Sequence, residues 1–277
     1  MLPGWGYNNM IRDITLGQYY PGDSPVHRLD PRVKIISTFA YLISLFLVRD
    51  FIGFAIAIIF LSLLIFISKV PVRFIFKGLK PIFFIIIFTF TVNMFMTKGE
   101  ILVSIWFLDI TKEGLYNAFF MGLRLVLLII GSSLLTLTTK PINLTDGIER
   151  LLSPFRRIGV PAHELAMMMT IALRFIPTLL EETDKIMKAQ MARGADFETG
   201  NILRRAKSLI PLLVPLFISA FRIAQDLAMA MEARCYRGGD ARTRMNAMRL
   251  KPADALASLC MLGFIAIIVI QAYFIPY

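Results

Sequence analysis

The chain has 277 residues, of which 57% are hydrophobic and 23 are Phe, and its mean hydropathy is +0.67. This composition is too apolar for a water-soluble domain of that length and indicates a polytopic membrane protein. The formal net charge of +11 would also suit nucleic-acid binding. However, the basic residues stand beside hydrophobic segments and lack the aromatic-plus-basic pattern of an RNA-binding motif, so nucleic acid is not expected as a partner.

Four long apolar segments in the first half of the chain are expected to cross the membrane as helices. Asp30-Pro31 is typical of a helix start, because a capping side chain is followed by proline in the first turn. Each segment approaches the roughly 17–25 residues of a spanning helix. The four predicted spans cover about residues 32–48, 51–68, 81–96 and 114–138.

Charges between these spans indicate which side of the membrane each connection occupies. Four basic residues and no acidic one separate the second span from the third, namely Lys69, Arg73, Lys77 and Lys80. Because cytoplasmic connections are enriched in Lys and Arg, this one is expected inside the cell, together with the N-terminus. Residues 98–113 carry two basic and three acidic side chains and are expected outside.

Residues 140–251 differ from the preceding spans, because charged residues recur every few positions among the apolar ones. This segment holds 18 Lys or Arg and 11 Asp or Glu, and the basic excess places it in the cytoplasm or at the membrane interface. Three amphipathic helices are expected there, and the last should bend at Pro211 and Pro215. Their expected ranges are about 146–157, 162–193 and 201–237.

A last apolar span is expected at about 253–274, which leaves the C-terminus outside the cell. In an alternative arrangement, part of residues 202–230 dips into the membrane, but its charge-free stretch 209–220 is too short to cross alone. The predicted fold is therefore an all-α polytopic membrane protein with five transmembrane helices and three amphipathic cytoplasmic or interfacial coupling helices.

Three regions follow from this arrangement. Residues 1–139 should form an N-terminal cytoplasmic segment and transmembrane helices 1–4. Residues 140–251 should form a cytoplasmic coupling domain with two long crossed helices, and residues 252–277 the C-terminal transmembrane helix. Because a short link at about 195–200 joins the two long helices, they are expected to pack against each other.

One short pattern, Ala-x-x-Ala-Arg-small, closes both long helices of the coupling domain. Its last three residues are Ala192, Arg193 and Gly194 in the first copy and Ala233, Arg234 and Cys235 in the second. A helix C-terminus favours a cation, and the alanines leave room for another backbone to approach. The guanidinium can then pair with a carboxylate or with helix-end carbonyls. The pattern predicts two separate docking places; the alternative is an ordinary arginine at a solvated helix end.

Other charged residues have less specific settings. Arg124 lies ten residues into the fourth span, where it either contacts a partner or the bundle interior, or extends toward the membrane surface. Arg174 precedes Glu181 and Glu182 by seven and eight residues, and a salt bridge within or between the coupling helices is the simplest interpretation.

Catalytic and nucleotide-binding motifs are not found. The only histidines, His27 and His163, do not form a His-Glu-x-x-His metal pattern, and no Gly-x-x-x-x-Gly-Lys-Ser/Thr phosphate loop is present. The five predicted spans also lack a central acidic residue of the kind that a secondary carrier would use. The sequence therefore predicts neither an enzyme nor a metal site, and a secondary carrier remains only an alternative.

The residues resemble a known family over nearly the whole chain: the transmembrane T component of energy-coupling factor (ECF) transporters, which is related to the membrane subunit of cobalt importers. The resemblance rests on residues 17–24 (Gly-Gln-Tyr-Tyr-Pro-Gly-Asp-Ser) and 27–34 (His-Arg-Leu-Asp-Pro-Arg-Val-Lys). It also rests on residues 173–177 (Leu-Arg-Phe-Ile-Pro) and on the two Ala-Arg-small motifs, the second of which ends in Cys235 instead of glycine.

The resemblance implies that Arg193 and Arg234 enter grooves of two ABC-type ATP-binding subunits, A and A′. Those partners would bind ATP and magnesium, so this chain would carry no cofactor and no catalytic residue. It would also hold one membrane-embedded S component and reorient it for uptake of a vitamin or similar micronutrient, in the plasma membrane of a prokaryote. A dedicated cobalt or nickel importer is the alternative within transport.

Overall fold

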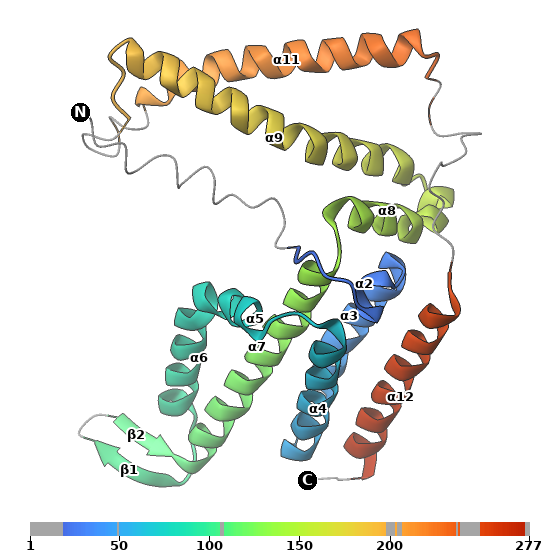
Figure 1. Ribbon diagram of the computed structural model, residues 1–277. Coiled ribbons are helices and arrows are strands. Elements are labelled where there is room, and N and C mark those ends of the chain that lie inside the picture. Colours follow the sequence, from blue (N-terminus) through green and yellow to red (C-terminus); the bar gives the residue numbers. More distant parts are fainter. Residues whose placement is uncertain are drawn as a thin grey trace. The chain divides into compact units, whose positions relative to one another are not determined.

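The computed structural model describes residues 19–48, 50–105, 108–197, 203, 207–236, 238 and 250–274 of the chain (Figure 1). These residues form two compact units. The bundle unit comprises the described residues of 16–148 and 246–277, and the long-helix unit comprises those of 149–245. Helices make up most of both units, which confirms the all-α class predicted from the sequence.

The bundle unit is built around four long helices that pack side by side, with a further helix against one edge (Figure 1). The four are α3 (Pro31–Leu47), α4 (Phe51–Ser68), α7 (Lys112–Thr138) and α12 (Pro252–Phe274), and α6 (Phe83–Met96) packs on α7. The connecting elements are α2 (Pro25–Arg28), α5 (Val72–Leu79), the 3-10 turn η1 (Lys80–Ile82) and the antiparallel strands β1 (Ile101–Ile105) and β2 (Leu108–Thr111).

Two buried acidic side chains fix the starts of α3 and α12. Asp30 caps α3, because its carboxylate accepts a hydrogen bond from the backbone N–H of Arg32, and Pro31 occupies the first turn as predicted. Asp254 accepts hydrogen bonds from the backbone N–H groups of Lys251 and Asp30, both at 2.7 Å. Asp254 is only 2% exposed, so one buried carboxylate joins the starts of two helices.

Aromatic side chains fill much of the space between the four long helices. Phe60 of α4 stacks on Phe264 of α12 with ring centroids 4.2 Å apart, and Phe54 of α4 meets Phe120 of α7 edge-on at 4.5 Å. A tight approach also occurs at Gly131 of α7, where an added Cβ would lie 2.5 Å from the ring of Tyr41. These contacts hold the helices at fixed spacings.

Arg124 of α7 lies inside the bundle unit. Its guanidinium donates a hydrogen bond of 2.8 Å to the carbonyl of Val48, which follows the last turn of α3 and has no helical donor of its own. The same guanidinium lies 5.6–6.0 Å from the ring centroids of Phe46, Phe54 and Phe120. Of the two alternatives for Arg124, the structure therefore favours a contact with the bundle interior.

The outer faces of the bundle unit are apolar. No residue of α6 is buried, although this helix consists almost entirely of apolar side chains, and Phe84 is 77% exposed. A helix that is apolar all round belongs inside a protein core or in lipid. The fold is therefore that of a polytopic membrane protein, as predicted.

Six of the described helical segments are long and apolar enough to cross a membrane. They are residues 51–68, 72–96, 112–138, 162–192, 210–233 and 252–274. Two of the six are the long helices of the charged region, and α3, predicted as the first span, is not among them because it has 17 residues. The division into five spans and three coupling helices consequently stays a prediction.

Two long helices dominate the long-helix unit. These are α9 (Ala162–Ala192) and α11 (Ile210–Ala233), which pack against each other. The chain enters the unit through the end of α8 (Pro141–Leu152) and the 3-10 segment η2 (Ser153–Ile158). Gly159, at φ +90°, ends η2 in a left-handed conformation that suits glycine.

Most helix boundaries agree with the sequence to within two residues, but several features differ. The third apolar segment was expected from about residue 81, but it is already helical from Val72, since nothing before Pro81 breaks a helix. Helix α8 was expected from about residue 146, but it starts at Pro141, because proline suits a first turn. The strands β1 and β2 pair in antiparallel orientation where only a loop was expected. One helix was expected over about residues 201–237, whereas α11 runs from Ile210, after a turn at Leu209, to Ala233. The described residues 203, 207 and 208, before that turn, are also helical.

Candidate docking sites at the ends of the long helices

The first repeated motif forms the C-terminal cap of α9. Ala192 is the last helical residue, Arg193 is the capping residue, and Gly194 adopts the left-handed conformation at φ +87°. The backbone N–H of Gly194 donates to the carbonyl of Met191, and that of Ala195 donates to the carbonyl of Gln190, both at 3.0 Å. This pair of bonds is the arrangement by which a left-handed glycine terminates a helix.

The second motif forms the same cap on α11. Ala233 is the last helical residue, Arg234 is the capping residue, and Cys235 is left-handed at φ 55°. The backbone N–H of Cys235 donates to the carbonyl of Glu232 at 2.8 Å, and that of Tyr236 donates to the carbonyl of Met231 at 3.0 Å. The repeated sequence therefore adopts the same backbone geometry at both helix ends. The small residue that closes each motif, Gly194 or Cys235, occupies the left-handed position.

Both motifs are fully accessible in the long-helix unit. Arg193, Arg234 and the four residues that flank them are exposed. Neither guanidinium pairs with any other described residue. The alanines one turn earlier, Ala189 and Ala230, are exposed as well, so low side chains surround each arginine. Each helix end therefore presents a cation to a partner, at the end of the helix where the dipole is negative.

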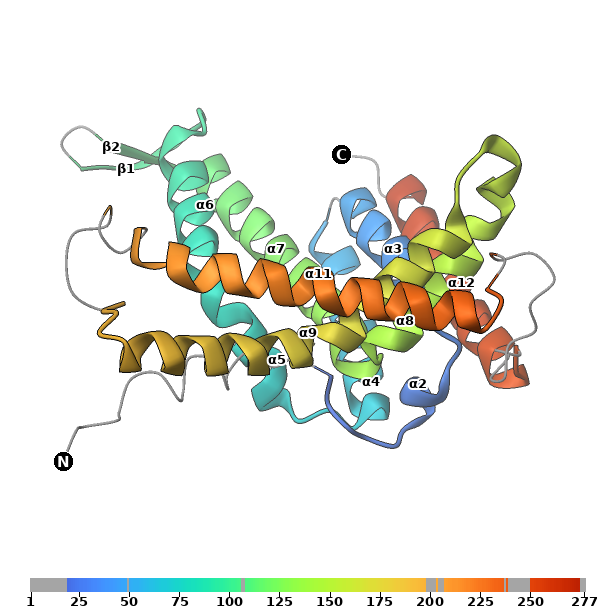
Figure 2. The same cartoon turned by 90° about the horizontal axis from the view of Figure 1, so that it is seen from above.

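The two motifs lie at opposite ends of the helix pair, because α9 and α11 run antiparallel (Figure 2). The start of α9 meets the end of α11 through a polar cluster formed by His163, Glu149 and Tyr236. His163 Nδ1 lies 3.1 Å from Glu149 Oε1, and His163 Nε2 lies 3.4 Å from the Tyr236 hydroxyl. Tyr236 follows Arg234 by two residues, so the cluster holds the second motif at the start of α9. The first motif lies at the other end of α9, about 45 Å away along the helix axis.

Among the described residues Arg174 forms no ion pair, and the salt bridge expected for it within or between the coupling helices stays a prediction. Glu182 forms an ion pair with Lys185, with a distance of 3.5 Å between Oε2 and Nζ. Residues three apart are neighbours on a helix, whereas the seven residues from Arg174 to Glu181 place these side chains about 10 Å apart along the axis. Arg174 and Glu181 are both exposed, so they remain available for contacts with partners.

Sequence reasoning did not single out the Glu149, His163 and Tyr236 cluster. Its members are separated by 14 and 73 residues, and no periodic pattern connects such distances. Asp254, in contrast, stands three residues after Lys251 at the start of an apolar helix. That spacing is typical of a side chain that reaches back to the capping residue, so this residue had a usable signal.

The left-handed turns make opposite substitutions informative. A non-glycine residue has a steric cost at positive φ. We therefore expect Cys235→Gly to stabilise the α11 cap by about 1 kcal/mol and Gly194→Ala to destabilise the α9 cap by a similar amount. Nothing lies within 4 Å of a Cβ at Gly194, so the effect is confined to the backbone. Hydrogen exchange of the Tyr236 and Ala195 amides measures each change, with the unaltered cap as the internal control. Equal exchange in both variants would contradict the assigned cap geometry.

Comparison with known proteins agrees with the resemblance seen in the sequence. Residues 22–245 match the family CbiQ, described as "Cobalt transport protein". The chain is also similar to proteins named "Energy-coupling factor transporter transmembrane protein EcfT". It is 60% identical to that of Thermosediminibacter oceani over 265 residues, which cover 96% of this chain and 100% of the relative.

Two further relatives carry the same name. The protein of Clostridium kluyveri is 60% identical over 264 residues, covering 95% of this chain and 98% of the relative. The protein of Ruminiclostridium cellulolyticum is 56% identical over 264 residues, covering 95% of this chain and 99% of the relative. The similarity therefore includes the membrane helices, both motifs and the link between them.

Proposed function

Because the chain belongs to the CbiQ family and is a transmembrane component of an energy-coupling factor transporter, we propose that two ATP-binding subunits dock on it and drive substrate uptake through it. The observation that carries this proposal is the pair of identical caps at opposite ends of α9 and α11. Two equal, separated docking points suit two related partners better than one. ATP and magnesium would be bound by those partners.

The docking chemistry follows from the caps. Each exposed guanidinium can form two parallel hydrogen bonds with a carboxylate in a groove of the partner, and the adjacent helix end can accept bonds from the partner's donors. Arg193 and Arg234 would therefore anchor the partners. If ATP binding closes the two partners on each other, the anchored helix ends are drawn together and α9 shifts along α11.

A membrane-embedded S component is the third proposed partner. On α11, the side chains of Leu213, Val214, Phe217 and Phe221 are 44–68% exposed and follow one another at helical spacing. Such an apolar stripe suits a membrane-embedded helix. Movement of α11 would then tilt the S component and release its cargo, a vitamin or similar micronutrient. In the proposed orientation, the basic residues from Lys69 to Lys80 lie in the cytoplasm.

A dedicated cobalt or nickel importer is the second candidate, favoured by the family description "Cobalt transport protein". The relatives at 56–60% identity are all named as energy-coupling factor components, which favours the first. Proteins that co-purify with the chain distinguish the two candidates. A membrane protein that binds a vitamin supports the first, and one that binds cobalt or nickel supports the second.

The proposed division of labour also predicts where ATP hydrolysis occurs. We expect the purified chain to show no ATPase activity above a blank, and the activity to appear when the two ATP-binding subunits are added. A matched sample with a catalytically inactive ATP-binding subunit serves as the control. Turnover by the chain alone would overturn the proposal, and turnover by the subunits that does not change when the chain is added would leave it without support.

A further inference from the structure

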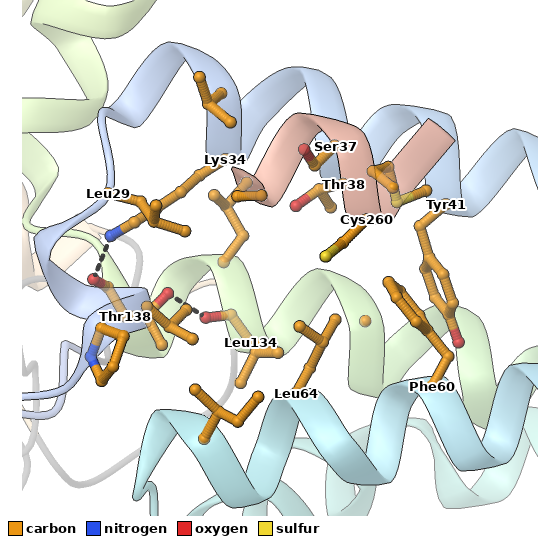
Figure 3. Close-up of a pocket in the computed structure, with 18 of the residues that line it drawn as sticks. Leu29, Lys34, Ser37, Thr38, Tyr41, Phe60, Leu64, Leu134, Thr138 and Cys260 are labelled. Atoms are coloured by element: carbon orange, nitrogen blue, oxygen red, sulfur yellow. Dashed lines mark hydrogen bonds between the residues drawn. The ribbon is translucent and has the colours of Figure 1, made fainter. Parts of the chain in front are cut away.

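The bundle unit contains an apolar cavity of about 280 Å³ that belongs to neither docking motif (Figure 3). One face of each of the helices α3, α4, α7 and α12 lines it. On α3 the lining runs from Val33 to Tyr41, and on α12 from Ala253 to Met261. Eight residues of helix correspond to about 12 Å, so the cavity extends from the helix ends to roughly the depth of one membrane leaflet.

Apolar side chains form most of the cavity wall, so most of the cavity offers water no hydrogen-bond partner. An apolar cavity of about 150 Å³ stays dry and accepts a molecule such as benzene. This one is nearly twice as large and lies in a unit whose surroundings are lipid. An acyl chain of a membrane lipid therefore fits its size, depth and chemistry.

A polar group stands at one end of the cavity. Lys34 of α3 is 7% exposed, and its ammonium donates hydrogen bonds to the carbonyls of His27 at 3.1 Å and Thr138 at 2.9 Å. An ammonium has three protons, so one donor remains for a ligand. The hydroxyls of Ser37 and Thr38 line the cavity beside it (Figure 3).

Three exposed lysines stand at the ends of the lining helices, each two residues from a lining residue. Lys69 follows the lining residue Ile67 by two positions, Lys140 follows Thr138 by two, and Lys251 precedes Ala253 by two. None of the three forms an ion pair with a described residue, although the ammonium of Lys140 lies 5.7 Å from the ring centroid of Tyr19. By contrast, the nearby Asp30 and Asp254 are buried and already accept backbone hydrogen bonds.

From these observations we propose that the cavity binds an anionic phospholipid, with one acyl chain between the four helices and the phosphate at the lysine-rich end. Basic pockets between membrane helices recognise anionic headgroups in this way. The bound lipid would fill the space between α3 and α12 and stabilise their packing. This inference depends on the chain being a membrane protein and not on the partners proposed above.

The first test uses the full chain in nanodiscs that contain phosphatidylglycerol with a photoactivatable group in one acyl chain. We expect labelling of residues 33–41 and 253–261, and a loss of roughly fivefold or more in Ala257→Phe, whose ring fills the cavity. Leu262→Phe is the matched control, because Leu262 lies on the same helix but is 63% exposed and outside the cavity. Equal labelling in the two variants would refute the site.

The headgroup is tested separately with the same probe on phosphatidylcholine. Wild type should be labelled more strongly by the phosphatidylglycerol probe than by the phosphatidylcholine probe. In the triple variant Lys69→Gln, Lys140→Gln, Lys251→Gln, this preference should fall by roughly fivefold or more. A fivefold change corresponds to the attraction of about one lysine to an anionic membrane surface. Acyl-chain labelling with phosphatidylcholine should be unchanged in the triple variant. No preference in wild type would overturn the anionic headgroup.

A thiol measurement keeps the proposal testable if Ala257→Phe does not fold. Cys260 lines the cavity, and in Cys235→Ser it is the only cysteine of the chain. In detergent, added phosphatidylglycerol should slow its reaction with a membrane-permeant maleimide, because the acyl chain covers the sulfur. Phosphatidylcholine should slow it less. A reaction rate that neither lipid changes would overturn the proposal.

Discussion

Reversing the charge at both helix ends, with Arg193→Glu and Arg234→Glu together, should abolish co-purification of the ATP-binding subunits while the chain still inserts in the membrane. Each arginine is exposed and pairs with none of the residues that the structure describes, so its replacement should remove contacts with a partner and leave the fold intact. An anchoring arginine at an interface contributes about 2 kcal/mol, so each substitution should weaken binding by roughly thirtyfold or more.

The single variants make this prediction sharper. If the two caps receive different subunits, Arg193→Glu should lose one subunit preferentially and Arg234→Glu the other, as measured by quantitative mass spectrometry of the purified complex. Arg222→Glu is the matched control, since Arg222 is an exposed arginine on α11 away from the helix end. If the double variant still assembles fully with the ATP-binding subunits, Arg193 and Arg234 do not anchor those subunits.

Removing the buried carboxylate in Asp254→Ala should destabilise the bundle unit by about 3 kcal/mol. The substitution leaves the backbone N–H groups of Asp30 and Lys251 without their acceptor. It also removes a negative charge close to the buried ammonium of Lys34. Thermal unfolding of the purified chain in detergent, followed by near-ultraviolet circular dichroism, measures the loss.

Two further variants separate the hydrogen bonds from the charge. Asp254→Asn keeps one acceptor oxygen and should lose less stability than Asp254→Ala. Asp23→Ala is the control, because Asp23 pairs with Arg28 at the surface, where both side chains are 71% exposed. The Arg28 guanidinium lowers the pKa of Asp23, but solvent screens this pair, so little change in unfolding temperature is expected. Equal losses of stability in Asp23→Ala and Asp254→Ala would contradict the conclusion that the buried Asp254 carboxylate joins the starts of α3 and α12.

Much of the fold follows from local sequence patterns. The helix starting at Asp30-Pro31, the uninterrupted span at residues 51–68 and the long helix ending at Gly194 were predicted within one or two residues. Each has a strong local signal, such as a capping side chain, a charge-free run of sufficient length or a terminal glycine. The pairing of β1 with β2 was missed, because a short strand pair depends on contacts that no single segment encodes.

The sequence by itself determined the membrane class, the family and the position of the two Ala-Arg-small motifs, because these depend on composition and on adjacent residues. Tertiary structure decided the rest. It placed Arg124 on the Val48 carbonyl, joined two helix starts through Asp254 and set the two caps at opposite ends of an antiparallel pair. Residues 76, 224 and 73 positions apart form these contacts, and only packing of the whole chain brings such residues together.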